Sequence, residues 1–311
     1  MLIINAMGKK PLFHKMLEAA PYFGPKLRLL DDCGYPPGHY YSTIPDLHEI
    51  REQRESLFKK SGVEIRGIDL RKENQFELLQ KFSKHYSEIP YDFETEKKTQ
   101  TRYQTQKAWY RYSDVIMLYS MIREFNPQRI IEIGSGHSSA VMLDANDLVL
   151  ESKATMTFID PDTERLDTIL TDKDKVNHQV IQSKIQDVNL EIFKSLQRND
   201  ILFIDSSHVS KIGSDLNHIL FEILPRVGPG VLIHFHDIYF PFEMPEDWVL
   251  TNKWFWNENY ILRAYLTDNS RYEIINFNSY LHEEFRDWFK INMPACLIST
   301  HDTGSIWIRK V

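Results

Sequence analysis

Cysteine is scarce in this 311-residue chain, which holds only Cys33 and Cys296. Two cysteines cannot build a disulfide scaffold or a cysteine-rich zinc site, and they suit a reducing compartment. No stretch approaches the ~20 apolar residues that a membrane span needs. The N-terminal segment places its short apolar run before its charges, which is the wrong order for a secretory signal. We therefore expect a cytoplasmic protein with no membrane partner.

A basic excess is also absent, because 44 acidic residues outnumber 37 basic ones and the formal net charge is −7. A nucleic-acid-binding surface favours the opposite balance, so we expect no nucleic-acid partner. The sequence contains neither internal repeats nor low-complexity segments. The remaining composition, with 42% hydrophobic and 26% charged residues, is that of an ordinary globular protein.

The most informative stretch is Arg129–Ser138, which reads Arg-Ile-Ile-Glu-Ile-Gly-Ser-Gly-His-Ser. An apolar run with one acid, Glu132, breaks into Gly134, Ser135 and Gly136, and a helix-compatible stretch follows. This pattern predicts a buried parallel strand that turns through glycines into a helix. The glycines allow close backbone approach to a ligand, and the helix start offers free N–H groups. The turn therefore predicts a nucleotide-like cofactor.

The acid in this stretch helps to choose the cofactor. A pyrophosphate would disfavour a carboxylate at Glu132, whereas a cationic ligand would prefer one. Ser139 also holds the third glycine position of the dinucleotide fingerprint. The stretch resembles the first motif of the class I S-adenosylmethionine (SAM) dependent methyltransferases, which reads acid-x-Gly-x-Gly. SAM carries a sulfonium and an ammonium but no phosphate, so the resemblance, which covers about 110–311, implies SAM as the cofactor.

From residue 129 onward the predicted strands and helices alternate, which is typical of a parallel sheet with right-handed crossovers. We expect strands at 129–133, 155–160, 178–182, 200–205, 230–235, 272–277 and 306–310. We expect helices at 112–125, 138–146, 163–170, 187–196, 212–225, 258–267 and 279–290. The implied fold class is α/β, a Rossmann-like seven-stranded methyltransferase sheet that is mostly parallel, with an antiparallel last strand and helices on both faces.

Residues 1–105 differ in composition and are predicted to form an N-terminal extension of helices and loops. Short helices are expected at 46–60 and 73–87. The segment 38–46 combines turn residues with aromatic rings, so it is a candidate lid over the acceptor site, with a structural loop as the alternative. Residues 106–311 are predicted to form the SAM-dependent methyltransferase domain.

The predicted cofactor site draws on several strand ends. Asp160 ends the second strand, where an acid can hold both ribose hydroxyls, with a solvated strand-end acid as the alternative. Gln186 and Asp187 follow the third strand, where many of these methyltransferases bind the adenine amino group, although Asp187 could equally cap the next helix. The full predicted set is Glu132, Gly134, Ser135, Gly136, Asp160, Gln186, Asp187 and Asp205.

The fourth strand ends in an Asp-x-x-His pattern, Asp205 to His208. This pattern resembles the metal-assisted O-methyltransferases of small molecules, including those that act on sugars of macrolide antibiotics. In those enzymes the first Asp binds a divalent metal, and a second acid stands where this chain has Ser207. That departure leaves His208 as the predicted catalytic base, with His236 as its rival.

The fifth strand ends in His236 and Asp237, beside the end of the fourth. Asp205, His236 and Asp237 are therefore the predicted ligands of a divalent metal ion. Carboxylates suit Mg²⁺ or Mn²⁺, and a histidine moves the preference toward Mn²⁺, Fe²⁺ or Zn²⁺. The alternative is a metal-free site in which the histidines orient the substrate or act as bases.

The resemblance implies a SAM-dependent methyltransferase that acts on a hydroxyl of a small molecule, with a sugar or glycan precursor as the candidate acceptor. Three alternatives stay open. They are N-methylation of an amine or a protein side chain, an NAD-dependent oxidoreductase, and a non-catalytic SAM-fold module. The polar cluster at the strand ends disfavours the last of these. A homodimer is the candidate assembly.

Overall fold

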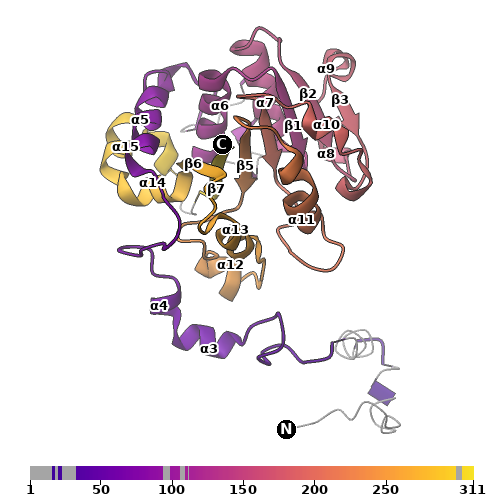
Figure 1. Cartoon of the computed structure of the whole chain (residues 1–311), viewed down its shortest axis with the longest axis vertical. Coiled ribbons are helices and arrows are strands. Elements are labelled where there is room, and N and C mark those ends of the chain that lie inside the picture. Colours follow the sequence, from indigo (N-terminus) through magenta and orange to yellow (C-terminus); the bar gives the residue numbers. More distant parts are fainter. Residues whose placement is uncertain are drawn as a thin grey trace. The chain divides into compact units, whose positions relative to one another are not determined.

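Figure 1 shows the computed structural model, which describes residues 16–17, 20–22, 33–93, 99–105, 109–110, 112–298 and 303–311. Of the predicted N-terminal extension, the segments 1–15, 18–19, 23–32 and 94–98 lie outside the described residues. The chain divides into two compact units, one of Met1–Leu57 with Trp248–Phe255 and the other of Phe58–Asp247 with Trp256–Val311.

The first unit contains the short helices α3 (Leu47–Glu52) and α4 (Arg54–Leu57). Asp46 caps α3, because its side chain accepts a hydrogen bond from the backbone N–H of His48 at 2.7 Å. In the segment before this cap, Tyr40 and Tyr41 are exposed and their rings contact one another. The lid role of 38–46 stays a prediction.

The second unit is built on a seven-stranded sheet with the strand order β3-β2-β1-β4-β5-β7-β6. The strands are β1 (Arg129–Ile133), β2 (Thr155–Ile159), β3 (Gln179–Ile181), β4 (Ile201–Ile204), β5 (Leu232–His236), β6 (Tyr272–Phe277) and β7 (Ser305–Lys310). The pairs are parallel except those of β7, which runs antiparallel to both β5 and β6. The predicted sheet is confirmed, including its antiparallel last strand.

Helices surround this sheet. They are α5 (Lys72–Ser83), α6 (Ser113–Phe125), α7 (His137–Leu148), α8 (Glu164–Asp167), α9 (Asp172–Asn177), α10 (Glu191–Lys194), α11 (Asp215–His218), α13 (Glu258–Leu266), α14 (Asn278–Glu284) and α15 (Arg286–Asn292). Helix α12 (Glu246–Leu250) crosses the boundary between the two units. Sequence analysis did not predict α9 or α12. Thr171 and Asp174 nevertheless form a capping box, a pattern that marks the start of α9. In the part of the chain that the structure describes, no helix is long and apolar enough to span a membrane.

Strand residues alternate between two buried clusters, one on each face of the sheet. Ile130, Phe203 and Trp307 face the cluster that contains residues of α5, α6 and α7. Ile133 and Phe235 face the cluster that contains residues of α11 and α13. Each fully buried large side chain contributes about 1.5–3 kcal/mol, so both faces hold the sheet in place. Helices cover both faces, as predicted.

Helix α5 lies with the sheet, although sequence analysis assigned it to the extension. The Gln75 side-chain oxygen accepts a hydrogen bond from the backbone N–H of Phe277 in β6 at 2.6 Å. The Phe76 ring stacks on Phe285, with ring centroids 4.3 Å apart. Leu79 is fully buried in the same cluster as α6. Residues from Phe58 onward therefore belong to the compact unit of the sheet rather than to a separate extension.

The register brings the carboxyl ends of four strands to one edge. The last paired residues are Ile133 with Ile159, Ile133 with Ile204, and Ile204 with Phe235. The residues that come next are Gly134, Asp160, Asp205 and His236. Open α/β sheets bind their ligands at this edge, so the candidate site is sought there.

Candidate functional site

Gly134 begins the turn after β1 and permits a very close approach of two chain segments. Its φ is +82°, and a Cβ atom at this position would lie 1.8 Å from the carbonyl oxygen of Asp205. Its backbone N–H donates to the carbonyl of Ile159, and the N–H of Asp205 donates to the carbonyl of Ile133, each at 2.9 Å. Only glycine fits this position, because any side chain would collide with the backbone after β4.

Glu132 supports the turn from inside the protein. It is fully buried, and its two oxygens accept hydrogen bonds from the hydroxyls of Ser138 and Ser139 in the first turn of α7. The Ser139 hydroxyl in turn accepts a bond from the N–H of Gly136 at 2.9 Å. Burial raises the pKa of Glu132 to about 8, against the opposing effect of the two serines. Both carboxylate oxygens of Glu132 therefore bind hydroxyls of α7, and its role toward a cationic cofactor stays a prediction.

Asp160 lies beside the glycine turn, and its ribose role stays a prediction. Its Oδ2 accepts a hydrogen bond from the N–H of Ser135 at 2.8 Å, and its Oδ1 accepts one from the N–H of Asp162 at 2.8 Å. The side chain is partly exposed. Gly136, the second glycine of the turn, lies against the side chain of Arg165 in α8.

Gln186 and Asp187 lie in the 3₁₀ turn Ile185–Asp187 after β3. Asp187 is exposed and does not cap α10, because that helix begins at Glu191, whose N–H donates to the side chain of Asn189. The Gln186 amide donates to the carbonyl of Gly213 at 2.9 Å. The adenine role of both residues stays a prediction.

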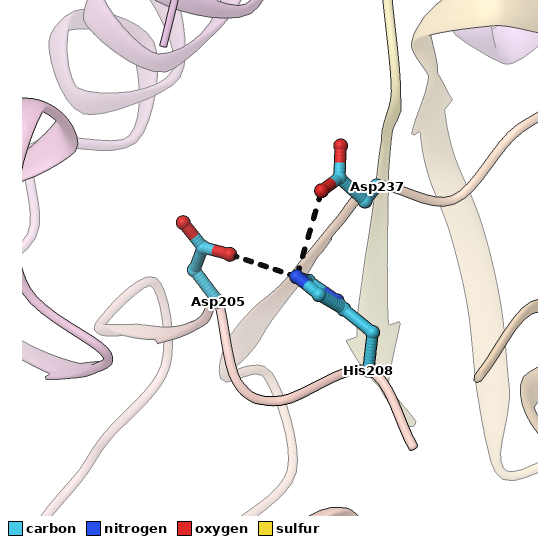
Figure 2. Close-up of side chains that lie close together, drawn as sticks. All are labelled: Asp205, His208 and Asp237. Atoms are coloured by element: carbon cyan, nitrogen blue, oxygen red, sulfur yellow. Dashed lines mark ion pairs between the residues drawn. The ribbon is translucent and has the colours of Figure 1, made fainter. Parts of the chain in front are cut away.

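Asp205, His208 and Asp237 converge at the ends of β4 and β5, as Figure 2 shows. The His208 Nε2 atom lies 3.4 Å from Asp205 Oδ1 and 3.5 Å from Asp237 Oδ2. One ligand atom from each of these three residues lies within 4.8 Å of the other two. Two carboxylates and one imidazole form a donor set that can hold a divalent cation. We refer to Asp205, His208 and Asp237 as the edge cluster.

A further carboxylate completes the surroundings of His208. Its Nδ1 atom lies 2.7 Å from Oε2 of Glu258, at the start of α13, and the Glu258 side chain is 2% exposed. Burial alone would lower the pKa of His208, but its hydrogen bonds to Asp205 and Glu258 and the charges around it raise the pKa well above the usual range. Burial would raise the pKa of Asp205, yet His236 and His208 together hold it below its usual range. For Asp237, burial outweighs the same two histidines and raises the pKa.

The edge cluster differs from the predicted metal ligands, since His208 stands in it where His236 was expected. His236 Nε2 lies 3.6 Å from Oδ1 of Asp237, and its ring packs against Tyr110 with centroids 4.8 Å apart. Strand alternation puts His236 on the face that also carries His234, whereas His208 reaches the cluster from the loop after β4. Ser207 binds Asp215 through its N–H and its hydroxyl.

Sequence reasoning missed Glu258. It lies 50 residues beyond His208 in the chain and opens a helix, where an acid is usually explained by the helix dipole. No local pattern marks it as part of the site, because only the folded chain brings it to His208.

A cavity of about 530 Å³ lies at the opposite end of the sheet, lined by the first residues of β1, β2 and β3. Its lining includes Arg129, Thr155 and Gln179 but no acidic residue. The chemistry-bearing side chains are at the carboxyl edge, so this cavity is not the candidate site.

Comparison with known proteins finds similarity over the part of the chain that carries this site. Residues 131–238 match a family described as a methyltransferase domain, and this segment runs from β1 to one residue past Asp237. An uncharacterised protein of Archaeoglobus fulgidus is 31% identical over 171 residues, which span 54% of this chain and 76% of that protein.

Similar solved structures include three methyltransferases. The O-methyltransferase TomG from Streptomyces achromogenes, in complex with SAM, is 12% identical, with 85% of this chain and 96% of that chain covered and a TM-score of 0.42. The Podospora anserina methyltransferase PaMTH1, bound to S-adenosylhomocysteine (SAH), is 14% identical, with 87% and 99% covered and a TM-score of 0.41. An O-methyltransferase from Bacillus cereus in complex with SAH is 12% identical, with 85% and 97% covered and a TM-score of 0.39.

Proposed function

We propose that this chain, part of which matches a methyltransferase domain, is a class I SAM-dependent methyltransferase that transfers the SAM methyl group to a hydroxyl of a small molecule with the help of a divalent cation. A sugar or glycan precursor is the proposed acceptor class. The observation that carries the proposal is the edge cluster, in which two carboxylates and an imidazole meet beside the glycine turn.

The proposed cofactor site is the turn after β1 together with the end of β2. Gly134 lets the backbone pass close to Asp205, and Asp160 lies at hydrogen-bonding distance from Ser135 of the turn. An acid at this strand end suits the two ribose hydroxyls of an adenosine. The carboxylates of Asp205 and Asp237 add negative charge at the same edge, which suits a sulfonium cofactor rather than a pyrophosphate.

The residues of the edge cluster fit a divalent cation. Asp205 and Asp237 offer one carboxylate oxygen each and His208 offers Nε2, all within 4.8 Å. Oxygen ligands with one nitrogen suit Mn²⁺ well and allow Mg²⁺. A cation bound here would lower the pKa of the acceptor hydroxyl and orient it.

Methyl transfer is an in-line displacement at the methyl carbon. The acceptor oxygen forms a new bond to this carbon while the carbon–sulfur bond breaks, and the electron pair of that bond stays on the sulfur of the product SAH. The protein must hold oxygen and methyl carbon ~3–3.5 Å apart and take up the hydroxyl proton. Charge is conserved, since the positive sulfonium becomes a neutral thioether and one proton is released.

We assign the uptake of this proton to His236 rather than to His208. Both ring nitrogens of His208 face carboxylates, Nδ1 toward Glu258 and Nε2 toward Asp205 and Asp237. His236 is outside the edge cluster, and its Nε2 lies 3.6 Å from Asp237. In the proposed cation site the lone pair of His208 Nε2 is used as a ligand and cannot accept the proton, whereas His236 has no ligand role there.

The test uses SAM labelled in its methyl group, a panel of sugars and other hydroxyl compounds, and EDTA. We expect SAH to accumulate and the label to appear in an O-methyl ether, with activity lost in EDTA and restored by Mn²⁺ or Mg²⁺. Full turnover in EDTA would contradict cation assistance, and label on nitrogen would contradict O-methylation. Calorimetry with SAH and with NAD provides the cofactor control, and NAD binding without SAH binding would refute the SAM site.

A further inference from the structure

Four consecutive residues, Trp256–Asn259, contact both loops that carry the edge cluster. Two backbone N–H groups of this segment donate to the carbonyl of His208, each at 3.2 Å. The Asn259 side-chain amide donates to the carbonyl of Asp237 at 3.0 Å. The start of α13 therefore joins the loop after β4 to the loop after β5, and it fixes the backbone of two residues of the site.

These two residues need such support. His208 has a φ of +60° and Asp237 has a φ of +56°, so both adopt a left-handed backbone that residues other than glycine rarely adopt. Such conformations persist where surrounding contacts over-determine them, and they cluster at functional sites. The hydrogen bonds from α13 to both carbonyls supply contacts of this kind.

Glu258 is the acid in this segment. Burying its carboxylate costs folding free energy, so its position calls for an explanation. The side chain is 2% exposed, and Oε2 lies 2.7 Å from His208 Nδ1. Its other oxygen, Oε1, is buried without a hydrogen-bond partner among the described residues. A carboxylate removed from water is expensive unless it is paired, and His208 is the partner that the structure provides. A role limited to starting a helix does not require a buried charge.

We propose that Glu258 is a positioning residue that fixes the His208 ring so that His208, and not His236, is the nitrogen ligand of the divalent cation. This inference rests on the cation site of the proposed function. In the proposed arrangement Glu258 is ionised and can only accept, so Nδ1–H of His208 donates to it, and Nε2 is left to face Asp205 and Asp237 at 3.4 and 3.5 Å. Figure 2 shows Nε2 directed between these two acids.

A general rule supports this assignment. A histidine that binds a metal commonly donates its other ring N–H to a carboxylate, which fixes the tautomer and makes the ligand nitrogen more basic. In the described part of the chain, neither a hydrogen bond nor a carboxylate of this kind is present at the Nδ1 atom of His236, which is buried without a hydrogen-bond partner. Of the two histidines, His208 therefore has the carboxylate at Nδ1 that supports a metal ligand, and His236 lacks it in the described part of the chain.

The first experiment measures Mn²⁺ affinity by electron paramagnetic resonance in the full chain and in Glu258→Gln. Loss of such a supporting carboxylate is expected to weaken Mn²⁺ binding ~10–100-fold. Glu283→Gln is the matched control, because Glu283 is exposed on α14 and its replacement removes the same charge. SAH affinity, measured by calorimetry, should be unchanged in both variants.

The outcomes separate this inference from the function on which it rests. If the wild-type protein binds Mn²⁺ and Glu258→Gln binds it equally well, the positioning role is refuted and the cation site stands. If the wild-type protein binds no Mn²⁺, the proposed cation site itself fails, and the inference fails with it.

A second experiment covers the case in which Glu258→Gln does not fold. Electron spin echo envelope modulation detects a nitrogen atom that is bound to Mn²⁺. Replacing a histidine with a purely structural role would leave this nitrogen signal unchanged. We expect this nitrogen signal in the wild-type protein and in His236→Ala, and its loss in His208→Ala. Loss in His236→Ala with retention in His208→Ala would overturn the proposal and make His236 the ligand.

Discussion

We expect His234 in β5 to lower the free energy of unfolding of this protein. The ring is fully buried, and neither of its nitrogens has a hydrogen-bond partner among the described residues. A buried polar group without a partner costs about 1–3 kcal/mol. The ring stacks on Phe203 with centroids 4.0 Å apart, and such a contact returns about 0.5–1.5 kcal/mol. His234→Leu removes both terms at similar volume, so we expect the variant to be more stable by about 1 kcal/mol at pH 8.

The stability difference between His234→Leu and the wild-type protein should grow at acidic pH. Burial, with a smaller contribution from His236, holds the pKa of His234 well below its usual range. Below pH 6.5 the unfolded chain therefore binds a proton that the native state does not, and the stability of the wild-type protein falls as the pH falls. One group of this kind costs about 1.4 kcal/mol by pH 5.5, which His234→Leu escapes.

Urea unfolding at pH 8 and pH 5.5, followed by fluorescence, measures both effects. The other titrating groups are common to the two proteins and cancel in the difference. His48→Leu is the control, because the His48 side chain is 80% exposed and its loss should change the pH dependence little. A variant less stable than wild type at pH 8, or an unchanged difference between the two pH values, would refute the reasoning.

Two further predictions concern the site. Gly134→Ala places a methyl group against the carbonyl of Asp205 in a backbone with φ of +82°, so we expect calorimetry to detect no SAH binding and the melting temperature to fall; SAH affinity equal to wild type would contradict the close approach. His236→Ala removes the assigned proton acceptor, so kcat should fall ~10²–10⁴-fold while SAH affinity stays the same. Turnover of His236→Ala at the wild-type rate would remove His236 from the mechanism.

The apolar runs of the sequence were sufficient to predict the sheet. Each of the seven strands begins within two residues of its predicted start. The apolar residues of these strands belong to one of the two buried clusters or pack against it. The Gly-Ser-Gly turn and the acids at 160 and 205 also lie at the predicted edge. These features depend on local pattern and on the rule that parallel strands share a carboxyl edge.

The edge cluster could not be predicted in full, because its members depend on loop conformation. His208 contacts Asp205 and Asp237 from a left-handed backbone conformation at its own position. No residue pattern predicts this conformation. Glu258 joins from a helix 50 residues away. Strand alternation places His236 on the same face as His234, but a strand pattern cannot rank His236 against a histidine in a loop.

The assignment of α5 failed for a related reason. Its apolar residues predicted a helix but not what that helix covers. The hydrogen bond between Gln75 and Phe277 crosses 202 residues, and the stack of Phe76 on Phe285 is equally remote in sequence. Composition separated this segment from the sheet, whereas packing unites them.

The place of β7 has a consequence for synthesis of the protein. This strand is the last of the sheet in chain order, yet it lies between β5 and β6 and pairs with both. Until residues 305–310 have left the ribosome, β5 presents an unpaired edge, β6 has no partner strand in the sheet, and the pocket for Trp307 is unfilled. Open strand edges are templates for association with other chains. The nascent protein should therefore depend on chaperones late in translation, and it should gain its protection against proteolysis in one step when β7 inserts.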